Sequence, residues 1–406
     1  MGTSAALRLV PLAASDAAAL SALARELAER AAEAPADLQR LERLARERLP
    51  RRAELRAAVL AADGEELRQG LEEAIDAVGA RLAVGRRFAV GYGAGHRVAF
   101  LFPGQGAPAR IGPGAVGAWV PAARGPFAVA GLLDGEPVPD DLVQLSVVAA
   151  CLGGLAAARE LGIVAELAVG HSLGELVALH WAGACDEPTL LQLARARGSA
   201  MTAHADRRGT MAALRCDAAQ VEGLAAETGV AVACRNSPRS CVVSGDASAV
   251  EDLLAAAKRA GLAAMPLPVV GAFHSPLMRP AQPVFAARLA GADLSPPQKP
   301  VFSTITGGRL DPAIDLRRLL LDQLVDPVLF ADALAAAAAE ADLLLDLGPG
   351  RILAPLVAEI TEKPLVSMRV GDPRPRGLLE VAAAAFAAGA TRAGGLTMPA
   401  PEAVAS

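Results

Sequence analysis

The sequence predicts an α/β fold with a predominantly parallel sheet, a smaller inserted unit and a separate α/β block at the N-terminus. Residues 98–102 form an unbroken apolar run, typical of a strand that is covered on both faces. Strands alternate with helices outside the insert, which favours a parallel sheet. Between residues 210 and 268 the order changes to βαββαβ, which is that of a ferredoxin-like unit.

The N-terminal block covers residues 1–95. Its predicted elements are a strand at 7–12, helices at 16–33 and 37–48, a strand at 55–62 and a helix at 63–78. Asp16 and Asp63 stand at helix N-cap positions, where a carboxylate accepts hydrogen bonds from free backbone N–H groups. The glycine-rich residues 91–95 predict the end of this block.

The second domain is expected to span residues 96–388 and to carry the insert at 210–268. Its other elements are expected as strands at 98–102, 167–169, 301–303, 343–346 and 365–368, and as helices at 140–161, 329–340 and 351–360. Residues 389–406 are rich in Ala, Pro and Gly, which is typical of a disordered linker.

Composition excludes several classes of protein. The 406 residues are 53% hydrophobic and 20% charged, with a net charge of −5, which argues against both disorder and nucleic-acid binding. No apolar run is expected to reach the roughly 20 residues of a membrane span, so no membrane partner is predicted. The five cysteines are scattered without a C-x-x-C pair, which indicates free thiols in a reducing cytoplasm and no metal site.

Residues 170–174, G-H-S-L-G, follow a predicted strand and open a helix. This pattern is typical of the nucleophile elbow of α/β-hydrolase-like enzymes, in which a tight turn lifts a serine hydroxyl above the sheet. Ser172 is therefore the candidate nucleophile, and the alternative is a serine that only caps the helix. The backbone N–H of Leu173 would then lie where it can stabilise an oxyanion.

A serine nucleophile needs a base at neutral pH, and the chain has five histidines. His171 adjoins Ser172, but an elbow turns its side chain elsewhere. His180 lies within a predicted helix, where a structural role is expected. His274 lies in a loop directly after the insert, at a domain junction where sites form. It is the candidate base, and an ordinary loop histidine is the alternative.

Arg197 lies on an apolar helical face. Its neighbours on that face are Leu190, Leu193 and Met201, whereas Arg195 falls outside it. A guanidinium on such a face needs a buried anion. The pattern leaves open whether this anion is a carboxylate of the protein or of a ligand.

Two glycine-rich turns follow predicted strands. Residues 104–109 partly match a dinucleotide-binding fingerprint, but no acidic residue stands about 20 positions on and Pro108 interrupts the helix start. A turn that lets the backbone of Gln105 approach a substrate is favoured instead. Residues 348–350, G-P-G, indicate a structural turn.

Together these motifs resemble the malonyl-CoA:acyl carrier protein transacylases and the acyltransferase domains of fatty acid and polyketide synthases. The resemblance covers about residues 97–388. Its segments, in family order, are 102–106 (FPGQG), 170–175 (GHSLGE), 197–198 (RG), 236–238 (NSP), 266–268 (PLP), His274 and Gln323. Residues 1–95 resemble the linker domain between ketosynthase and acyltransferase in type I polyketide synthases, chiefly through 9–12 (LVPL) and 57–60.

The resemblance implies a Ser172–His274 dyad whose base is oriented by a backbone carbonyl near Gln323. It also implies an oxyanion hole formed by the N–H groups of Gln105 and Leu173. The implied substrate-binding residues are Arg197, which would hold the free carboxylate of a malonyl group, and Gln323, Phe273, Asn236 and His171.

The implied reaction is ping-pong transfer of malonyl from coenzyme A to the phosphopantetheine thiol of an acyl carrier protein, next to a ketosynthase domain and without a bound cofactor. Residues 271–274, G-A-F-H, resemble the malonyl-type signature H-A-F-H with Gly271 in place of histidine. Phe273 would crowd an α-methyl branch. The spacing from Gln105 to Ser172 is short, and the arginine-rich lead before residues 143–144 that is typical of modular synthases is absent. Both departures suggest an iterative synthase, for example of the enediyne or polyunsaturated-acid type.

Two other classes share parts of this pattern. A serine hydrolase uses the same elbow but needs an aspartate partner, and no aspartate stands in a recognisable triad context. A non-catalytic docking module would not need Ser172, His274 and Arg197 together.

Overall fold

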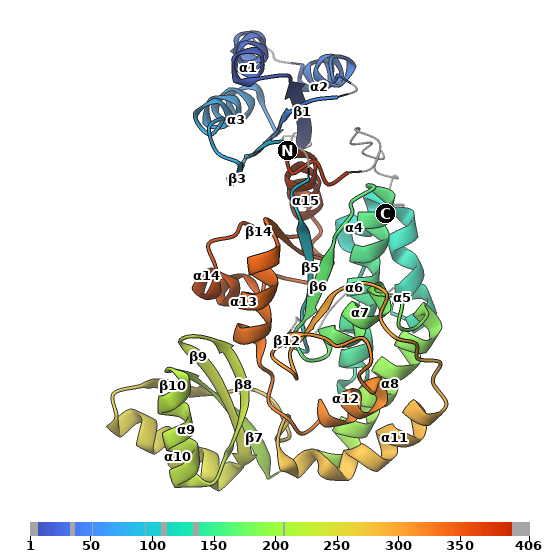
Figure 1. The fold of residues 1–406 in the computed structure, drawn as a ribbon, viewed down its shortest axis with the longest axis vertical. Coiled ribbons are helices and arrows are strands. Elements are labelled where there is room, and N and C mark those ends of the chain that lie inside the picture. Colours follow the sequence, from blue (N-terminus) through green and yellow to red (C-terminus); the bar gives the residue numbers. More distant parts are fainter. Residues whose placement is uncertain are drawn as a thin grey trace, which may run out of the picture.

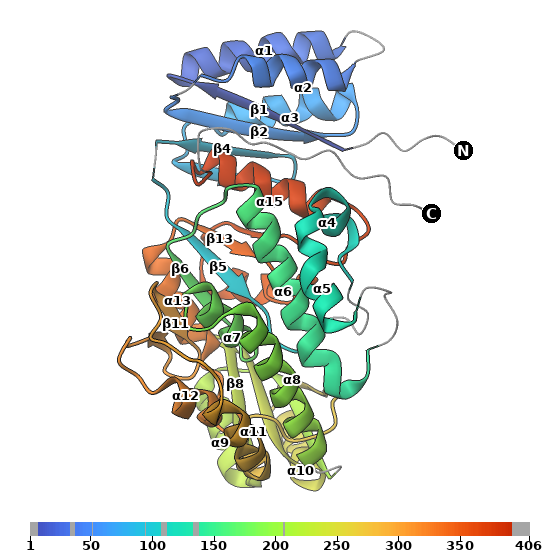
Figure 2. The same ribbon diagram turned by 90° about the vertical axis from the view of Figure 1, so that its right-hand side faces the viewer.

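The computed structural model describes residues 7–32, 37–50, 52–93, 95–106, 112–132, 138–205 and 208–391. Within these residues, three sheets define the architecture (Figure 1). A six-stranded sheet occupies the middle of the molecule, and a four-stranded sheet lies at each end (Figures 1 and 2). The α/β fold predicted from the sequence is thereby confirmed.

The N-terminal sheet has the order β1-β2-β4-β3 with antiparallel neighbours. The elements of this block are β1 (Arg8–Ala14), α1 (Ala17–Ala32), α2 (Leu38–Glu47), β2 (Leu55–Ala61), α3 (Gly64–Asp76), β3 (Leu82–Val84) and β4 (Phe88–Tyr92). The carboxylates of Asp16 and Asp63 each accept a backbone N–H at 2.8 Å, from Ala19 and Glu66, as predicted for N-caps.

The sequence pattern misses β3 and β4, and the glycine-rich residues 91–95 are not purely a boundary. Gly91 belongs to β4, where a Cβ would lie 2.2 Å from the carbonyl oxygen of Ala387. Glycine therefore allows α15 (Arg376–Ala387) to pack closely against this strand.

Helix α15 joins the N-terminal block to the rest of the chain. It covers the face of the N-terminal sheet opposite α1 (Figure 2). Leu9 and Leu60 of the sheet share one buried apolar cluster with Phe386 of α15 and with the central sheet. The alternate strand residues, such as Val10 and Val59, pack instead with α1 and α3 in a second cluster. The two faces follow the strand period of two residues.

The chain beyond α15 differs in part from its prediction as a disordered linker. Ala390 accepts a hydrogen bond from the backbone N–H of Val164 at 2.9 Å, and Thr391 bridges to Ile163. Backbone pairing therefore holds residues 389–391 in place. Residues 392–406 lie outside the described part of the chain.

The central sheet has the order β12-β11-β6-β5-β13-β14, and its strands run parallel except for β12. Its strands are β5 (Val98–Phe102), β6 (Leu167–Gly170), β11 (Val301–Ser303), β12 (Gly308–Arg309), β13 (Leu343–Asp346) and β14 (Leu365–Ser367). Phe100 and Phe102 of β5 pack in the cluster of the helices α6 and α7, whereas Leu101 packs in that of α13 and α14. Helices on both faces explain the unbroken apolar run.

The helices around the central sheet include several that the sequence pattern misses. Those covering it or flanking it are α4 (Gly114–Trp119), α5 (Gly125–Ala130), α6 (Val143–Glu160), α7 (Gly174–Trp181), α8 (Glu187–His204), α11 (Gln282–Ala290), α12 (Leu316–Asp322), α13 (Phe330–Glu340) and α14 (Ala354–Ile360). Single turns of 3-10 helix lie at Pro121–Arg124, Asp140–Leu142 and Pro276–Ala281. The helices α4, α5, α11 and α12 are absent from the sequence prediction.

The expectation that no run could span a membrane needs correction. By length and composition alone, the segment Asp140–Glu160 is long and apolar enough to cross a membrane. In the structure, 78% of the most apolar 18-residue stretch of this segment is buried within the protein. The apolar character of α6 therefore serves the core, where it contacts α5 and α8.

The insert forms the second four-stranded sheet, of order β10-β7-β9-β8 with antiparallel neighbours. Its elements are β7 (Gly209–Arg215), α9 (Ala218–Thr228), β8 (Ala231–Ser237), β9 (Ser240–Asp246), α10 (Ala247–Arg259) and β10 (Ala263–Pro266). The predicted βαββαβ order is confirmed. Helices α9 and α10 bury their own apolar cluster against this sheet.

Candidate active site

Ser172 occupies the turn between β6 and α7 with a φ of +49°, which non-glycine residues rarely adopt. Glycines on both sides make the turn possible. A Cβ on Gly170 would lie 2.1 Å from the carbonyl carbon of Gly174, and a Cβ on Gly174 would lie 2.1 Å from the carbonyl oxygen of Phe102. The G-x-S-x-G spacing thus reflects the packing of this turn against β5.

His274 faces Ser172 from the loop that follows the insert. Its Nε2 lies 2.8 Å from the hydroxyl oxygen of Ser172, and its Nδ1 lies 3.2 Å from the backbone carbonyl oxygen of Asp326. Because a carbonyl oxygen only accepts, Nδ1 carries the proton and Nε2 accepts from the serine hydroxyl. The structure therefore places a Ser–His pair here, with a backbone carbonyl as the third group.

The surroundings of His274 keep its ring neutral. Burial lowers the pKa of this imidazole to about 3, and the positive charge of Arg197 acts in the same direction, as does the nearby imidazole of His171 whenever it is protonated. A neutral imidazole with a free Nε2 lone pair can take a proton from Ser172. The other histidines outside this cluster, His96, His180 and His204, each contact a backbone carbonyl oxygen at 2.9–3.2 Å.

Arg197 on α8 is 1% exposed and lies beside the nucleophile. Its Nη1 donates to the side-chain oxygen of Gln144 at 2.7 Å, its Nη2 lies 3.4 Å from the Ser172 hydroxyl, and its Nε has no partner. Apart from the longer-range charge of Glu175, this guanidinium has no carboxylate within ion-pair distance in the described ranges. Burial lowers its pKa to about 10, so it stays a cation at neutral pH.

Two buried polar side chains, Glu175 and Gln323, lie next to the backbone of the Ser172 turn. The amide nitrogen of Gln323 donates to the backbone carbonyl of Ser172 at 3.1 Å and lies 3.4 Å from a carboxylate oxygen of Glu175. The same oxygen accepts from the hydroxyl of Thr304 at 3.1 Å. Burial raises the pKa of Glu175 to about 7. Gln323 therefore holds the nucleophile turn through its backbone.

The two predicted oxyanion donors are free. The backbone N–H groups of Gln105 and Leu173 donate to no acceptor in the described part of the chain. The side-chain oxygen of Gln105 accepts from Gln144 at 2.9 Å, so a hydrogen-bonded chain runs from Arg197 through Gln144 to the loop of Gln105. A developing oxyanion is stabilised by backbone N–H groups that have no other acceptor.

The remaining predicted residues lie at the junction with the insert. His171 donates through Nε2 to the side-chain oxygen of Asn236 on β8 at 2.8 Å, and its ring tilts against Phe330 at 5.1 Å. Phe273 is half-buried next to His274. Gly271 has a φ of +109°, and a Cβ there would lie 2.8 Å from that of Ala205, so this backbone requires the glycine.

Sequence reasoning missed Gln144 and Glu175 as site residues. Each is a buried polar residue on an otherwise apolar helix, α6 or α7, and this is the signal that could have found them. No group of three or more His, Cys, Asp or Glu side chains among the described residues could hold a metal ion. The cluster is thus one of nucleophile, neutral base, unpaired cation and free N–H donors.

Comparison with known proteins fits this arrangement. The sequence model of the acyl transferase domain matches residues 127–367. The chain belongs to this acyl transferase family. The acyl transferase is 33% identical over 300 residues to the malonyl CoA-acyl carrier protein transacylase of Bacillus subtilis. This alignment covers 68% of the chain and 94% of the Bacillus protein. The family resemblance seen in the sequence is therefore confirmed.

Two further similarities are to polyketide synthases, and the second extends over the N-terminal block. The acyl transferase is 35% identical over 353 residues to the polyketide synthase GfsB of Streptomyces halstedii, covering 79% of the chain but only 6% of the synthase. It is also similar to the crystal structure of the acyltransferase domain of an iterative polyketide synthase in enediyne biosynthesis, with a TM-score of 0.83, 35% identity, and coverage of 95% and 97% of the two chains.

Proposed function

We propose that this acyl transferase moves a malonyl group from malonyl-CoA to the phosphopantetheine thiol of an acyl carrier protein, through an ester on Ser172. The observation that carries the proposal is the buried, unpaired Arg197 guanidinium 3.4 Å from the Ser172 hydroxyl. In malonyl-CoA, one methylene separates the thioester carbonyl from a carboxylate. A carboxylate bound to Arg197 would thus bring the thioester to Ser172.

The guanidinium has one edge available for a carboxylate. Gln144 occupies Nη1, which leaves the edge formed by Nε and Nη2. Paired N–H donors bind a carboxylate with two parallel hydrogen bonds. An acetyl group has no carboxylate and would leave this edge unpaired, so the same contact selects between the two acyl groups.

The chemistry follows from the Ser172–His274 geometry. His274 Nε2 takes the hydroxyl proton while Ser172 Oγ bonds to the thioester carbon, and the N–H groups of Gln105 and Leu173 stabilise the oxyanion. Collapse breaks the C–S bond, and His274 returns the proton to the leaving thiolate of coenzyme A. In the second half, His274 takes the proton of the incoming thiol while the thiol sulfur bonds to the ester carbon. Collapse breaks the bond between that carbon and Ser172 Oγ, and His274 returns the proton to Oγ.

The proposal also covers the choice of malonyl over methylmalonyl, the neighbouring domain, the domain bounds and the cellular setting. Phe273, next to the base, would crowd an α-methyl branch and favour malonyl over methylmalonyl. The similarity to polyketide synthases supports a ketosynthase as neighbour, with residues 1–95 as linker and 96–388 as acyl transferase. The five free cysteines accord with a cytoplasmic setting and need no disulfide.

Intact-mass spectrometry after mixing the chain with malonyl-CoA tests the proposal. We expect a covalent malonyl adduct that disappears in Ser172→Ala and is discharged by a phosphopantetheine-bearing carrier protein. A useful control is Ser240→Ala, a half-buried serine of the insert, which should leave the adduct unchanged. No adduct with any acyl-CoA would refute the transferase. An adduct discharged equally fast by water alone would indicate a hydrolase.

A further inference from the structure

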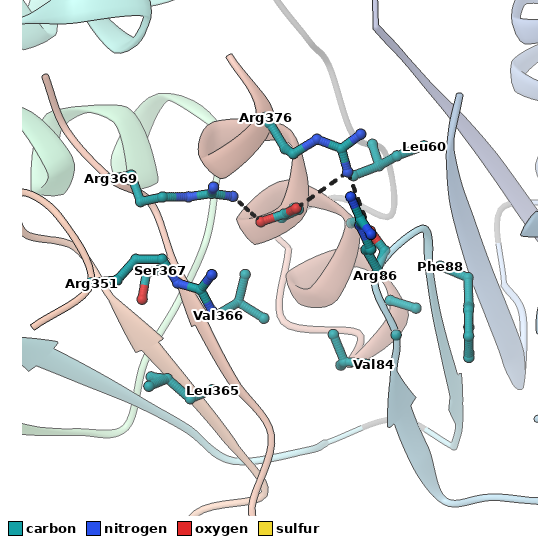
Figure 3. Close-up of a pocket in the computed structure, with 14 residues that line it drawn as sticks. Leu60, Val84, Arg86, Phe88, Arg351, Leu365, Val366, Ser367, Arg369 and Arg376 are labelled. Carbon is teal, nitrogen blue, oxygen red and sulfur yellow. Dashed lines mark hydrogen bonds and ion pairs between the residues drawn. The ribbon is translucent and has the colours of Figure 1, made fainter. Parts of the chain in front are cut away.

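A cavity of about 420 Å³ lies between the N-terminal sheet and the edge of the central sheet (Figure 3). Its walls come from the turn between β3 and β4, from β14 and from α15. Its lining includes none of the residues around Ser172, so the proposed transfer reaction does not account for it.

The charges around this cavity are unbalanced. Its lining contains the arginines Arg86, Arg351, Arg369 and Arg376 but only one acid, Glu380. Glu380 forms an ion pair with Arg369 and a second with Arg376 at 3.6 Å. The lining therefore carries three more positive than negative charges, whereas the whole chain has a net charge of −5. Like charges held together repel, and a bound anion relieves that repulsion.

Several of these guanidinium groups have donors without an acceptor. The side chains of Arg86 and Arg351 make no hydrogen bond or ion pair with any residue that the structure describes, and Nε of Arg369 is buried without a partner. Figure 3 shows Arg86 beside Arg376 on one side of the cavity, with Arg351 and Arg369 on the other. The donors thus surround the space from both the N-terminal sheet and the central sheet.

The lining also indicates the chemistry of the occupant. Guanidinium groups bind phosphate oxygens with paired hydrogen bonds, and one carboxylate would neutralise only one of three excess charges. A diphosphate carries several negative charges in a compact group. The apolar side chains of Leu60, Val84 and Val366 form the rest of the wall, suited to a less polar part of the ligand. The volume is in the range of small-molecule sites.

We propose that this cavity binds a small molecule carrying a diphosphate group, of which a nucleoside diphosphate is the representative. The ligand would connect Arg86 of the N-terminal block with Arg351 and Arg369 of the acyl transferase. Because it would bind only the folded chain, it would also raise the unfolding temperature.

Isothermal titration of the full chain with inorganic pyrophosphate, ADP and adenosine, at constant ionic strength, tests this site. We expect saturable one-to-one binding of pyrophosphate and ADP but not of adenosine. Arg351→Gln should weaken it about ten-fold or more, the size of effect expected for a charge-assisted hydrogen bond. Arg351 has no hydrogen bond or ion pair to lose and acts within the protein only through its charge near the buried Asp346, and malonyl loading by this variant verifies that it is folded.

The matched control is Arg374→Gln, which removes the same charge from an arginine outside the cavity whose side chain is 81% exposed. It should bind pyrophosphate as the unmodified chain does. The proposal is overturned by the absence of saturable binding at millimolar pyrophosphate, by equal weakening in both variants, or by adenosine binding as tightly as ADP.

Discussion

Glu175 shows how one buried side chain can serve the site without touching substrate. Its carboxylate is fully buried, contacts Thr304 and Gln323, and has one oxygen with no hydrogen-bond partner. Gln323 in turn holds the backbone of Ser172. Glu175 is thus a positioning residue for the nucleophile turn.

The raised pKa of Glu175 predicts a pH-dependent contribution to stability. The folded-state pKa is about 7 against an ordinary value of 4.5. A carboxyl with a raised folded-state pKa stabilises the fold fully below 4.5, and that contribution is lost as the pH rises to 7. Glu175→Gln does not ionise. The difference in unfolding temperature between Glu175→Gln and the unmodified chain should therefore shift by several degrees in favour of the variant as the pH is raised from 4.5 to 8.

Thermal unfolding of both proteins across this pH range provides the measurement. Asp346, whose pKa burial also raises to about 7, is present in both and cancels in the comparison. His274 acts in the opposite direction between about pH 3 and 6.5, again in both. Parallel unfolding-temperature curves for the two proteins would show that Glu175 does not ionise in this window.

Residues that gather at the candidate site were predictable where a motif surrounds them. Ser172 and Arg197 stand out because a turn pattern and a helical face identify them. The carbonyl of Asp326 leaves no trace in the sequence, because any residue type supplies a backbone oxygen. Gln144 and Glu175 are visible only as polar residues within apolar helices, and their partners lie far away in the chain.

At the scale of elements, the turn between β6 and α7 is tightly constrained. In Gly174→Ala the new methyl group would meet the carbonyl oxygen of Phe102 at 2.1 Å, so the start of α7 must move away from β5. A shift of this kind displaces the Ser172 hydroxyl from His274. We expect the rate of malonyl-enzyme formation to fall about 100-fold, since small misplacements of reacting groups have effects of this size.

Stopped-flow measurement of coenzyme A release gives that rate. The matched control is Gly223→Ala on α9, where no atom lies within 4 Å of the added methyl group. It should keep the full rate and should be slightly stabilised by the better helix propensity of alanine. A Gly174→Ala variant with unchanged acylation would contradict the packing account of the G-x-S-x-G motif.

Elements with strong periodicity or caps were predictable, and short ones were not. The strand β5 and the helices capped by Asp16 and Asp63 follow directly from local pattern. The strands β3 and β4 are short and next to glycines, and α4 and α5 are helices of one to two turns without a side-chain cap. Such elements are stabilised by tertiary packing, which local sequence does not record.

At the scale of the whole molecule, the site depends on segments that meet only in the folded chain. Ser172 and Arg197 come from the central domain, His274 from the loop after the insert, and Asn236 from the insert itself. The hydrogen bond between His171 and Asn236 connects the nucleophile turn to β8. The orientation of the insert thus contributes to the position of the catalytic pair.

The N-terminal block is similarly tied to the acyl transferase. Phe386 near the C-terminal end packs with Leu9 near the N-terminal end in one buried cluster. The sequence predicted a separate N-terminal block, but not that α15 would cover the second face of its sheet. That pairing joins residues almost the full chain length apart, and no local pattern encodes it.

The central claim is that Arg197 selects an acyl group by its carboxylate. Its most direct test is the ratio of single-turnover acylation rates with malonyl-CoA and acetyl-CoA, measured in the unmodified chain, in Arg197→Ala, and in Arg195→Ala as an exposed control on the same helix. We predict a fall of about 100-fold in the malonyl-to-acetyl ratio for Arg197→Ala and no change for Arg195→Ala. An unchanged ratio in Arg197→Ala would contradict the account.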